Sequence, residues 1–373
     1  MAESWQERFD RIWKFPDQTA EKWKKKTGKK VLGWTLPDAP EELIYASGVL
    51  PMALLARGID FSLADAHFQG FACSYSRSLL ELLEQGKLDF LDGILIAHTC
   101  DTMRAFDLVV KEMERFELCE SYRLPRVYGN PASERYFRQE LERIRCRLSE
   151  LSGHYPDAEE IRSAIKVFHQ LKSALSNLKT ELKAGKISAR LFFSALRAGM
   201  VGDKEEVRQM IEQYREELKN KEPEPEKKFK VILAGKVAEP FEIIEEIEKA
   251  GFWVVDDLLA LGSRWLSAVA ELEQEPLTAL IKAQERKLPF AGLTHQKKSR
   301  AEWLIERVKE NQAQGVIYLL QRFCEPYELE VVGMEQELKE AGIAFLRLES
   351  TYQPASLPAL RTRLDAFYEM LSE

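Results

Sequence analysis

The chain has 373 residues and a net charge of −7, from 54 basic and 61 acidic side chains that are well mixed. This charge argues against a general nucleic-acid-binding protein, and a hydrophobic content of 45% is ample for two or three domains. The start, MAESWQERFDRIWKF, is polar rather than a secretion signal, and no apolar stretch reaches the length of a membrane span. We therefore expect a cytoplasmic protein, with reduced cysteines, that binds neither membranes nor nucleic acids.

The first part of the chain predicts an N-terminal helix and then an α/β domain. Residues 1–28 favour a helix, and residues 29–131 form the domain. Strand candidates in this domain are the apolar runs KKVLGWT, VLPMALL, FSLAD, DGILIAH and LPRVYG. The segment EELIYASG, which follows a proline-containing turn, predicts a helix.

Residues 132–228 have the pattern of long helices followed by a linker. Apolar residues recur there every three to four positions, and Asp157 and Asp203 fit helix N-caps. The stretch KEPEPEKK is charged and contains prolines, so it predicts a boundary between domains.

Residues 229–373 predict a second α/β domain. FKVILAG, FWVVDD, GVIYLLQ and IAFLRLES are strand candidates that alternate with the helix candidates EPFEIIEEIEKAG, LLALGSRWLSAVAELE, KSRAEWLIERVKENQAQ and EPYELEVVGMEQELKEAG. A final helix is expected in SLPALRTRLDAFYEML. The predicted fold class is α/β, with two Rossmann-like parallel-sheet domains and an intervening helical segment.

Three of the five cysteines share one kind of position. Cys73, Cys100 and Cys324 each lie on a loop at the start of a predicted helix, whereas Cys119 and Cys146 are expected within helices. A helix N-terminus lowers the pKa of a thiol and favours the thiolate, the form that binds metals. The alternative is that these cysteines pack as small hydrophobic residues, because no CxxC spacing supports a local metal motif.

Two segments have a similar pattern. FLDGILIAHTCD and AQGVIYLLQRFCEP both contain a glycine, an apolar strand, a cysteine and an acidic residue before a helix. Ligands of parallel sheets bind beyond the carboxyl ends of the strands. The pattern therefore predicts two related halves that bring Cys100 and Cys324 to one cleft.

Several standard motifs are absent from the sequence. GxxxxGK[ST], GxGxxG after a strand, HExxH and GxSxG do not occur, and the histidines are scattered. The chain is therefore not expected to hydrolyse ATP through a phosphate loop or to bind a dinucleotide. An iron–sulfur or zinc site is the remaining cofactor candidate.

The cysteine segments resemble a known family. APEELIYASGVLPMAL, ADAHFQGFACSYSRSLLELLEQGKLDFLDGILIAHTCDTMRAF, VILAGKVAEPFEIIEEIEKAGFWVVDDLLALGSRWL, QGVIYLLQRFCEPYELE and the closing ESTYQPASLPALRTRLDAFYEML occur in the order seen in the 2-hydroxyacyl-CoA dehydratase and benzoyl-CoA reductase family. The similarity spans about residues 29–373. It implies a 4Fe-4S cluster held by Cys73, Cys100 and Cys324, with the fourth iron free.

The resemblance also implies partners and a reaction. It implies an acyl-CoA substrate, a related second subunit in a heterodimer or a homodimer, and a separate ATP-dependent iron–sulfur activator that supplies one electron. One electron added to a 2-hydroxyacyl thioester gives a ketyl radical that expels the hydroxyl group. Alternatives are a benzoyl-CoA reductase-type subunit, a small-molecule reductase that acts as a homodimer, and a non-catalytic scaffold or electron-relay subunit.

Some site residues follow from the same resemblance. Ser76, Arg77 and Ser78 are similar to a family pair that would hydrogen-bond to cluster sulfurs. Arg104 lies one turn after Cys100 and is a candidate ligand of CoA phosphates, although a surface ion pair is the alternative. Ser74 departs from the family pattern, in which many members have proline.

The segment DD…GSR is also similar to the family. Asp256 and Asp257 could transfer protons or cap the next helix, and Arg264 is a candidate cofactor-binding residue. His98, which lies before the second cysteine, is a candidate general base; an ordinary loop histidine is the alternative.

Overall fold

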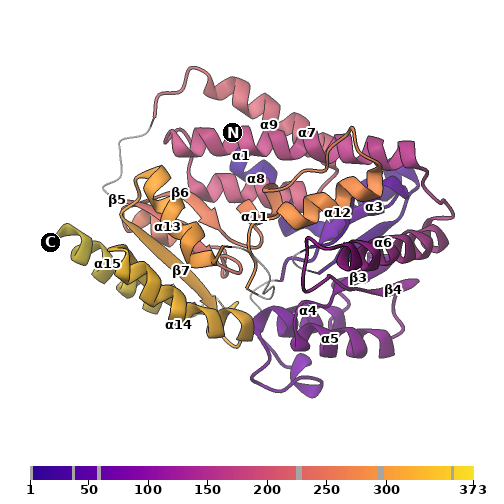
Figure 1. The fold of residues 1–373 in the computed structure, drawn as a ribbon, viewed down its shortest axis with the longest axis horizontal. Helices are drawn as coiled ribbons and strands as arrows, with labels where there is room; N and C mark the ends of the chain where they lie inside the picture. The colour runs from indigo at the N-terminus through magenta and orange to yellow at the C-terminus, as the bar shows by residue number, and fades with distance from the viewer. Residues whose placement is uncertain (1–2, 36–37, 57–59, 224–228, 292–297, 354–356) are drawn as a thin grey trace.

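Two four-stranded parallel sheets form the framework of the part of the chain that the structure describes (Figure 1). The structure is a computed structural model that describes residues 3–35, 38–56, 60–223, 229–291, 298–353 and 357–373. The first sheet consists of β1 (Val31–Trp34), β2 (Leu50–Ala53), β3 (Gly93–Ala97) and β4 (Leu118–Tyr122). The second sheet consists of β5 (Phe229–Gly235), β6 (Phe252–Leu258), β7 (Gly315–Gln321) and β8 (Ala344–Ser350). The predicted α/β class with two Rossmann-like sheets is confirmed.

The two sheets share one topology. Their orders are β2-β1-β3-β4 and β6-β5-β7-β8, so in each sheet the first strand lies between the second and the third. All the pairings are parallel. The two segments that look alike in the sequence contain β3 and β7, which are the third strands of their sheets. Cys100 and Cys324 therefore follow equivalent strands.

Helices surround both sheets and connect them. In the N-terminal part they are α1 (Trp5–Lys14), α2 (Pro16–Thr27), α3 (Glu41–Ala46), the short 3-10 helix η1 (Ala64–Ala66), α4 (Ser74–Glu84) and α5 (Asp101–Glu112). In the middle they are α6 (Pro131–Ser152), α7 (Ala158–Lys183), α8 (Ala189–Val201) and α9 (Lys204–Leu218). In the C-terminal part they are α10 (Ile243–Lys249), α11 (Ser263–Leu266), α12 (Pro276–Arg286), α13 (Arg300–Asn311), α14 (Glu325–Glu340) and α15 (Leu357–Ser372).

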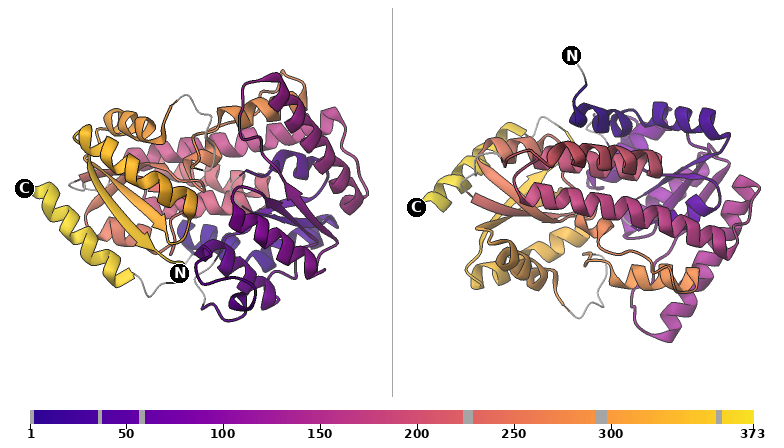
Figure 2. Two further views of the ribbon diagram at one scale, coloured as in Figure 1. Left: turned by 60° about the horizontal axis from the view of Figure 1, so that its bottom comes forward. Right: turned by 90° about the horizontal axis from the view of Figure 1, so that it is seen from above.

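The middle helices pack against both sheets. α7 contacts α3 beside the first sheet and β6 in the second, and α8 contacts β2 as well as β6. The right-hand view of Figure 2 shows the long magenta helix α7 running past both sheets. α12 comes after β6 in the chain but packs on α6 and α7. The two sheets are thus tied together through these helices.

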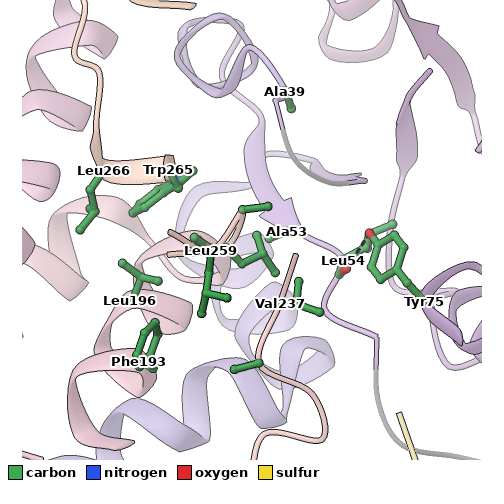
Figure 3. Close-up of a cluster of buried hydrophobic side chains, with 14 of the residues drawn as sticks. Ala39, Ala53, Leu54, Tyr75, Phe193, Leu196, Val237, Leu259, Trp265 and Leu266 are labelled. Atoms are coloured by element: carbon green, nitrogen blue, oxygen red, sulfur yellow. Dashed lines mark hydrogen bonds between the residues drawn. The ribbon is translucent and has the colours of Figure 1, made fainter. Parts of the chain in front are cut away.

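An apolar cluster lies where the two halves meet. Figure 3 shows side chains from α8, from β2 and from the loops that follow β5 and β6 gathered in one place. Leu196, Leu259 and Trp265 in this cluster are almost fully buried. The hydrophobic effect therefore favours one fixed arrangement of the halves.

The N-terminal region differs from the predicted single helix. α1 ends at Lys14, and α2 begins at Pro16 after Phe15. Proline at a first helical position cannot donate a backbone hydrogen bond to the preceding turn, so a new helix begins there. Asp157 and Asp203 do cap α7 and α9, as predicted.

Four further expectations about local structure are wrong. FSLAD leads into η1 and does not form a strand. LPRVYG is not a strand either, because β4 ends before it. Cys119 lies in β4 and not in a helix. The expected helix LLALGSRWLSAVAELE is reduced to α11. By contrast, the strand candidate FWVVDD is present as β6, which contains Asp256 and Asp257 and extends to Leu258. Buried pairing with β5 extends the strand through these two polar residues.

No helix in the described ranges is long and apolar enough to cross a membrane.

Candidate metal centre

Three cysteines begin helices, as the sequence predicts. Cys73, Cys100 and Cys324 are the residues directly before α4, α5 and α14. Cys73 follows β2 through a long loop, whereas the other two follow β3 and β7 almost at once. All three are therefore placed at the carboxyl ends of parallel strands, where these folds bind their ligands.

The three thiols lie within electrostatic range of one another. The charge of Cys73 acts on both Cys100 and Cys324, and that of Cys100 acts on Cys324. Cys73 and Cys324 are buried, and Cys100 is partly exposed. Two cysteines from the first half and one from the second therefore converge on one place.

The pKa values of Cys100 and Cys324 differ from the expectation. Burial raises the pKa of Cys324 to about 12, and burial also raises that of Cys100, although the nearby Lys236 opposes both changes. Backbone N–H groups at the start of α5 and α14 lower the pKa of these thiols, as helix N-termini should, but burial outweighs them. The free thiols of Cys100 and Cys324 are therefore protonated at neutral pH, and a bound metal would have to displace their protons.

The cysteines do not form a site for a single ion. Within the described ranges, no three His, Cys, Asp or Glu side chains converge closely enough to hold one metal ion. Around one tetrahedral zinc, thiolate sulfurs lie roughly 4 Å apart. In a cluster of several irons, each thiolate binds a different iron, so wider spacing is needed. A donor set of three cysteines has the chemistry that suits an iron–sulfur cluster.

Lys236 lies beside the cysteines and is not among the site residues predicted from the sequence. It follows β5 directly and is 6% exposed. The thiols of Cys324, Cys73 and Cys100 exert the largest charge effects on it. A lysine after a glycine has no sequence signal of its own; only its burial among thiols reveals it.

Ser76, Arg77 and Ser78 were predicted to hydrogen-bond to the cluster. Ser76 Oγ lies 3.4 Å from the Sγ of Cys73, which agrees with this expectation. Arg77 turns away: it pairs with Asp65 and stacks on the ring of Phe61 at 4.3 Å. Ser78 is buried on α4. Ser76 is thus placed for the predicted contact, and Arg77 is not.

His98 lies at the end of β3 and contacts a carboxylate. Its Nε2 is 2.9 Å from Asp107, which also accepts a hydrogen bond of 2.9 Å from Lys111. The carboxylate orients the imidazole as a second residue orients a catalytic base. The geometry suits a general base, and the role stays a prediction.

His98 also lines a basic pocket. This pocket of 810 Å³ lies between α5, the loop after β4 and the start of α6. The lining includes His98 and the cationic residues Arg104, Lys111, Arg123 and Arg126. Arg104 is mostly exposed and forms one long ion pair, 3.4 Å from Asp101. Both alternatives for Arg104 are thus present: it has a surface partner and it faces an anion-attracting pocket.

Asp256 and Asp257 belong to a buried ion-pair network. Lys179 of α7 contacts both carboxylates, and Arg307 of α13 donates a hydrogen bond of 3.0 Å to Asp256. These cations hold the pKa of Asp256 at about 2 against the opposing effect of burial. Asp257 accepts hydrogen bonds of 2.7 and 2.6 Å from the backbone N–H and hydroxyl of Ser263. Of the two predicted roles, the capping role of Asp257 is present.

Arg264 joins the two halves of the molecule. It donates a hydrogen bond of 2.6 Å to Asp38, which follows β1, and Lys287 lies 3.1 Å from the same carboxylate. Arg264 is 2% exposed, and within the described ranges its Nε and Nη1 have no hydrogen-bond partner. The predicted cofactor-binding role of Arg264 is not tested by this ion pair.

A second pocket borders the cysteine loops. It has a volume of about 330 Å³ and is bounded by the start of α4 and the loops after β2, β7 and β8. Ala72 and Ser74, the neighbours of Cys73, line it together with Phe323, the neighbour of Cys324. Phe323 has a φ of +63°, a conformation that costs energy for a bulky residue and marks functional sites. A small molecule in this pocket would lie against the cysteine loops.

Comparisons with known proteins find a family and relatives that match nearly the whole chain. Residues 38–371 match the family model described as "2-hydroxyglutaryl-CoA dehydratase, D-component". The (R)-phenyllactyl-CoA dehydratase beta subunit of Clostridium sporogenes is 25% identical, with 97% of each chain covered. A benzoyl-CoA reductase subunit of Thauera aromatica is 25% identical, with 94% of each chain covered. The (R)-2-hydroxyglutaryl-CoA dehydratase subunit beta of Acidaminococcus fermentans is 26% identical, with 98% of each covered.

Proposed function

Because this chain belongs to the 2-hydroxyglutaryl-CoA dehydratase D-component family, we propose that it is the cluster-bearing subunit of a 2-hydroxyacyl-CoA dehydratase-like enzyme. The observation that carries the proposal is the convergence of Cys73, Cys100 and Cys324 from two sheets on one place. These three residues would hold a 4Fe-4S cluster and leave one iron position free.

The chemistry requires an electron at the substrate carbonyl. A cluster with an open iron position would supply that electron at close range. The electron converts the thioester carbonyl into a ketyl radical anion, which expels the α-hydroxyl group. The β proton of the resulting radical is acidic enough for a protein side chain to remove, which gives a second ketyl radical anion. Return of its electron to the cluster would then release the 2-enoyl-CoA, so water is eliminated without net oxidation or reduction.

The residues of the basic pocket suit the other parts of an acyl-CoA. His98, oriented by Asp107, is the candidate proton acceptor. Arg104, Arg123 and Arg126 in the same pocket would bind CoA phosphates through charge-assisted hydrogen bonds. This arrangement supports an acyl-CoA as the substrate class.

We infer that the chain works with other proteins. All three of the similar proteins are named as subunits, two of them as beta subunits, which supports a related second subunit as the partner. The absence of a phosphate-loop motif supports a separate ATP-dependent activator as the electron donor. Such an assembly would be located in the cytoplasm, which keeps thiols reduced.

A reductase subunit is the second candidate function. The benzoyl-CoA reductase subunit and the (R)-phenyllactyl-CoA dehydratase beta subunit are both 25% identical to this chain. A reductase would use the same cysteines but add electrons to an aromatic thioester instead of eliminating water. Product analysis separates the two, because a dehydratase gives a 2-enoyl-CoA.

Anaerobic purification with iron and sulfide analysis tests the proposal. We expect about four irons per chain, with most of the iron lost in Cys100→Ser and retained in Cys146→Ser, the exposed cysteine of α6. Acyl-CoA turnover is then measured with and without the co-purifying partner and with an ATP-dependent one-electron donor. A folded chain that binds no iron under these conditions would refute the cluster assignment.

A further inference from the structure

The backbone after β5 places Lys236 in the interior. Gly235 has a φ of +127°, and a Cβ there would lie 2.2 Å from the carbonyl oxygen of Leu319 in β7. Only glycine permits this close approach of the two strands. The carbonyl of Lys236 then accepts a hydrogen bond of 2.8 Å from the backbone N–H of Ala260. The position of Lys236 is thus fixed by β7 and by the loop that follows β6.

The side chain of Lys236 lies among the cysteines. Its Nζ is 4.7 Å from the ring centre of Tyr75, two residues after Cys73. Burial raises the pKa values of Cys100 and Cys324, and the charge of Lys236 is the largest effect that lowers them. Lys236 therefore comes from the second sheet to a place that all three thiols share.

Among the described residues, no carboxylate pairs with this buried ammonium group. Within the described ranges Lys236 forms no ion pair or side-chain hydrogen bond. The other buried lysines have oxygen partners: Lys172 pairs with Glu42, Lys204 contacts backbone carbonyls and Lys287 pairs with Asp38. Burying a charge without a partner is costly, so an anion is expected beside Lys236.

We propose that Lys236 is the positive countercharge of the three cysteine thiolates and raises the reduction potential of the cluster that they hold. This inference rests on the proposed function. Each metal-bound thiolate has lost its proton and carries negative charge, and reduction by one electron adds another negative charge. A fixed positive charge in a buried site stabilises the reduced form more than the oxidised form. Lys236 exchanges no proton in this role; it is a positioning and tuning residue.

The test uses the full chain, loaded anaerobically with iron and sulfide, and three substitutions. Lys236→Met removes the charge at similar length, and Lys236→Arg keeps it. Lys230→Met is the matched control, because Lys230 lies in β5, the strand that Lys236 follows, and its Nζ is likewise near an aromatic ring, 5.0 Å from the ring centre of Trp253. Midpoint potentials come from dithionite titration followed by optical and electron paramagnetic resonance spectra.

We expect Lys236→Met to lower the equilibrium constant for one-electron reduction at least tenfold, which is a midpoint potential lower by about 59 mV. Lys236→Arg and Lys230→Met should stay close to the wild type. A potential unchanged in Lys236→Met, with iron retained, would overturn the inference. A wild-type chain that binds no iron under these conditions would instead refute the proposed function. The failure of the inference and the failure of the proposed function are therefore distinguishable.

Stability of the iron-free chain provides a second readout. Without thiolates the ammonium has no countercharge, so Lys236→Met should unfold at a temperature no lower than the wild type. In the iron-loaded chain the same substitution should lower the unfolding temperature or cause iron to be lost. A Lys236→Met chain that is destabilised equally with and without iron would show a purely structural role and overturn the inference.

Discussion

Arg264 and Asp38 form a buried ion pair with a hydrogen bond of 2.6 Å between positions that lie 226 residues apart in the sequence. Asp38 follows the first strand of the first sheet, and Arg264 is on the helix that follows β6 of the second sheet. Both side chains are at most 2% exposed. The pair therefore fixes the carboxyl ends of β1 and β6 relative to each other. The cysteines also lie at the carboxyl ends of their strands.

The first prediction concerns the strength of this connection. Arg264→Met should lower the free energy of unfolding by about 3 kcal/mol, because it leaves a buried carboxylate with Lys287 alone. Urea denaturation followed by circular dichroism measures the change. Arg286→Met is the control, because its surface pair with Glu271 should contribute less than about 1 kcal/mol. Equal effects of the two substitutions would contradict the role of Arg264.

The second prediction concerns acid pH. Burial raises the pKa of Asp38, but Arg264 and Lys287 outweigh it and hold the pKa at about 2. The pKa in the unfolded chain is about 3.9, so this carboxylate stabilises the fold above about pH 4, by about 2.5 kcal/mol, and the contribution is lost as the pH falls towards 2. Asp38→Asn should be less stable at pH 7 and should lose less stability between pH 4 and 2. The free energy of unfolding is measured for the wild type and Asp38→Asn between pH 4 and 2. Equal losses of stability in the two chains would contradict the stabilising role of the Asp38 carboxylate.

The sequence predicted the elements that carry the cysteines. Short apolar runs bounded by glycine identified β3 and β7, and a helix was predicted directly after each of the three cysteines, where α4, α5 and α14 lie. These signals are local, so they can be recognised without knowledge of the tertiary structure. The position of each cysteine before a helix followed from the same signals.

Features that depend on burial could not be predicted. Lys236 looks like any lysine in the sequence, and its surroundings come from strands and helices far apart in the chain. The raised pKa of Cys324 is likewise a consequence of burial, which outweighs the helix N-terminus that the sequence does indicate. β4 was missed because Glu120 and Ser121 interrupt its apolar character, and pairing with β3 stabilises it instead.

The third prediction concerns cluster removal. The proposed ligands come from both sheets, so metal binding should link the two halves and stabilise the fold. We expect iron loading to raise the unfolding temperature of the wild-type chain and to have little effect on Cys324→Ser. Differential scanning calorimetry of loaded and chelator-treated chains measures this difference. Cys119→Ser, in β4, is the matched control and should respond to iron as the wild type does.

The fourth prediction separates structural from catalytic roles in β6. Lys179→Met should lower the free energy of unfolding by about 3 kcal/mol or more, because it leaves two buried carboxylates short of a cation. Asp257→Asn should also destabilise the chain, through the weakened hydrogen bonds to Ser263. If Lys179 and Asp257 have only structural roles, both variants should keep the iron content and the turnover of the wild type at low temperature. A turnover loss in folded Asp257→Asn would instead support proton transfer by this residue.

The fifth prediction concerns the basic pocket. Arg104 has one long ion pair and is mostly exposed, so Arg104→Ala should change stability by less than about 1 kcal/mol. If Arg104 binds a CoA phosphate, the loss of a charge-assisted hydrogen bond should raise KM roughly tenfold and leave kcat unchanged, because the contact is equal in ground and transition states. Arg208→Ala is the control, since Arg208 pairs with Glu212 on α9, outside the residues that line the pocket. The KM increase should also shrink as salt rises, because salt screens the contact that the variant lacks. An unchanged KM in Arg104→Ala would leave the Asp101 ion pair as the role of this side chain.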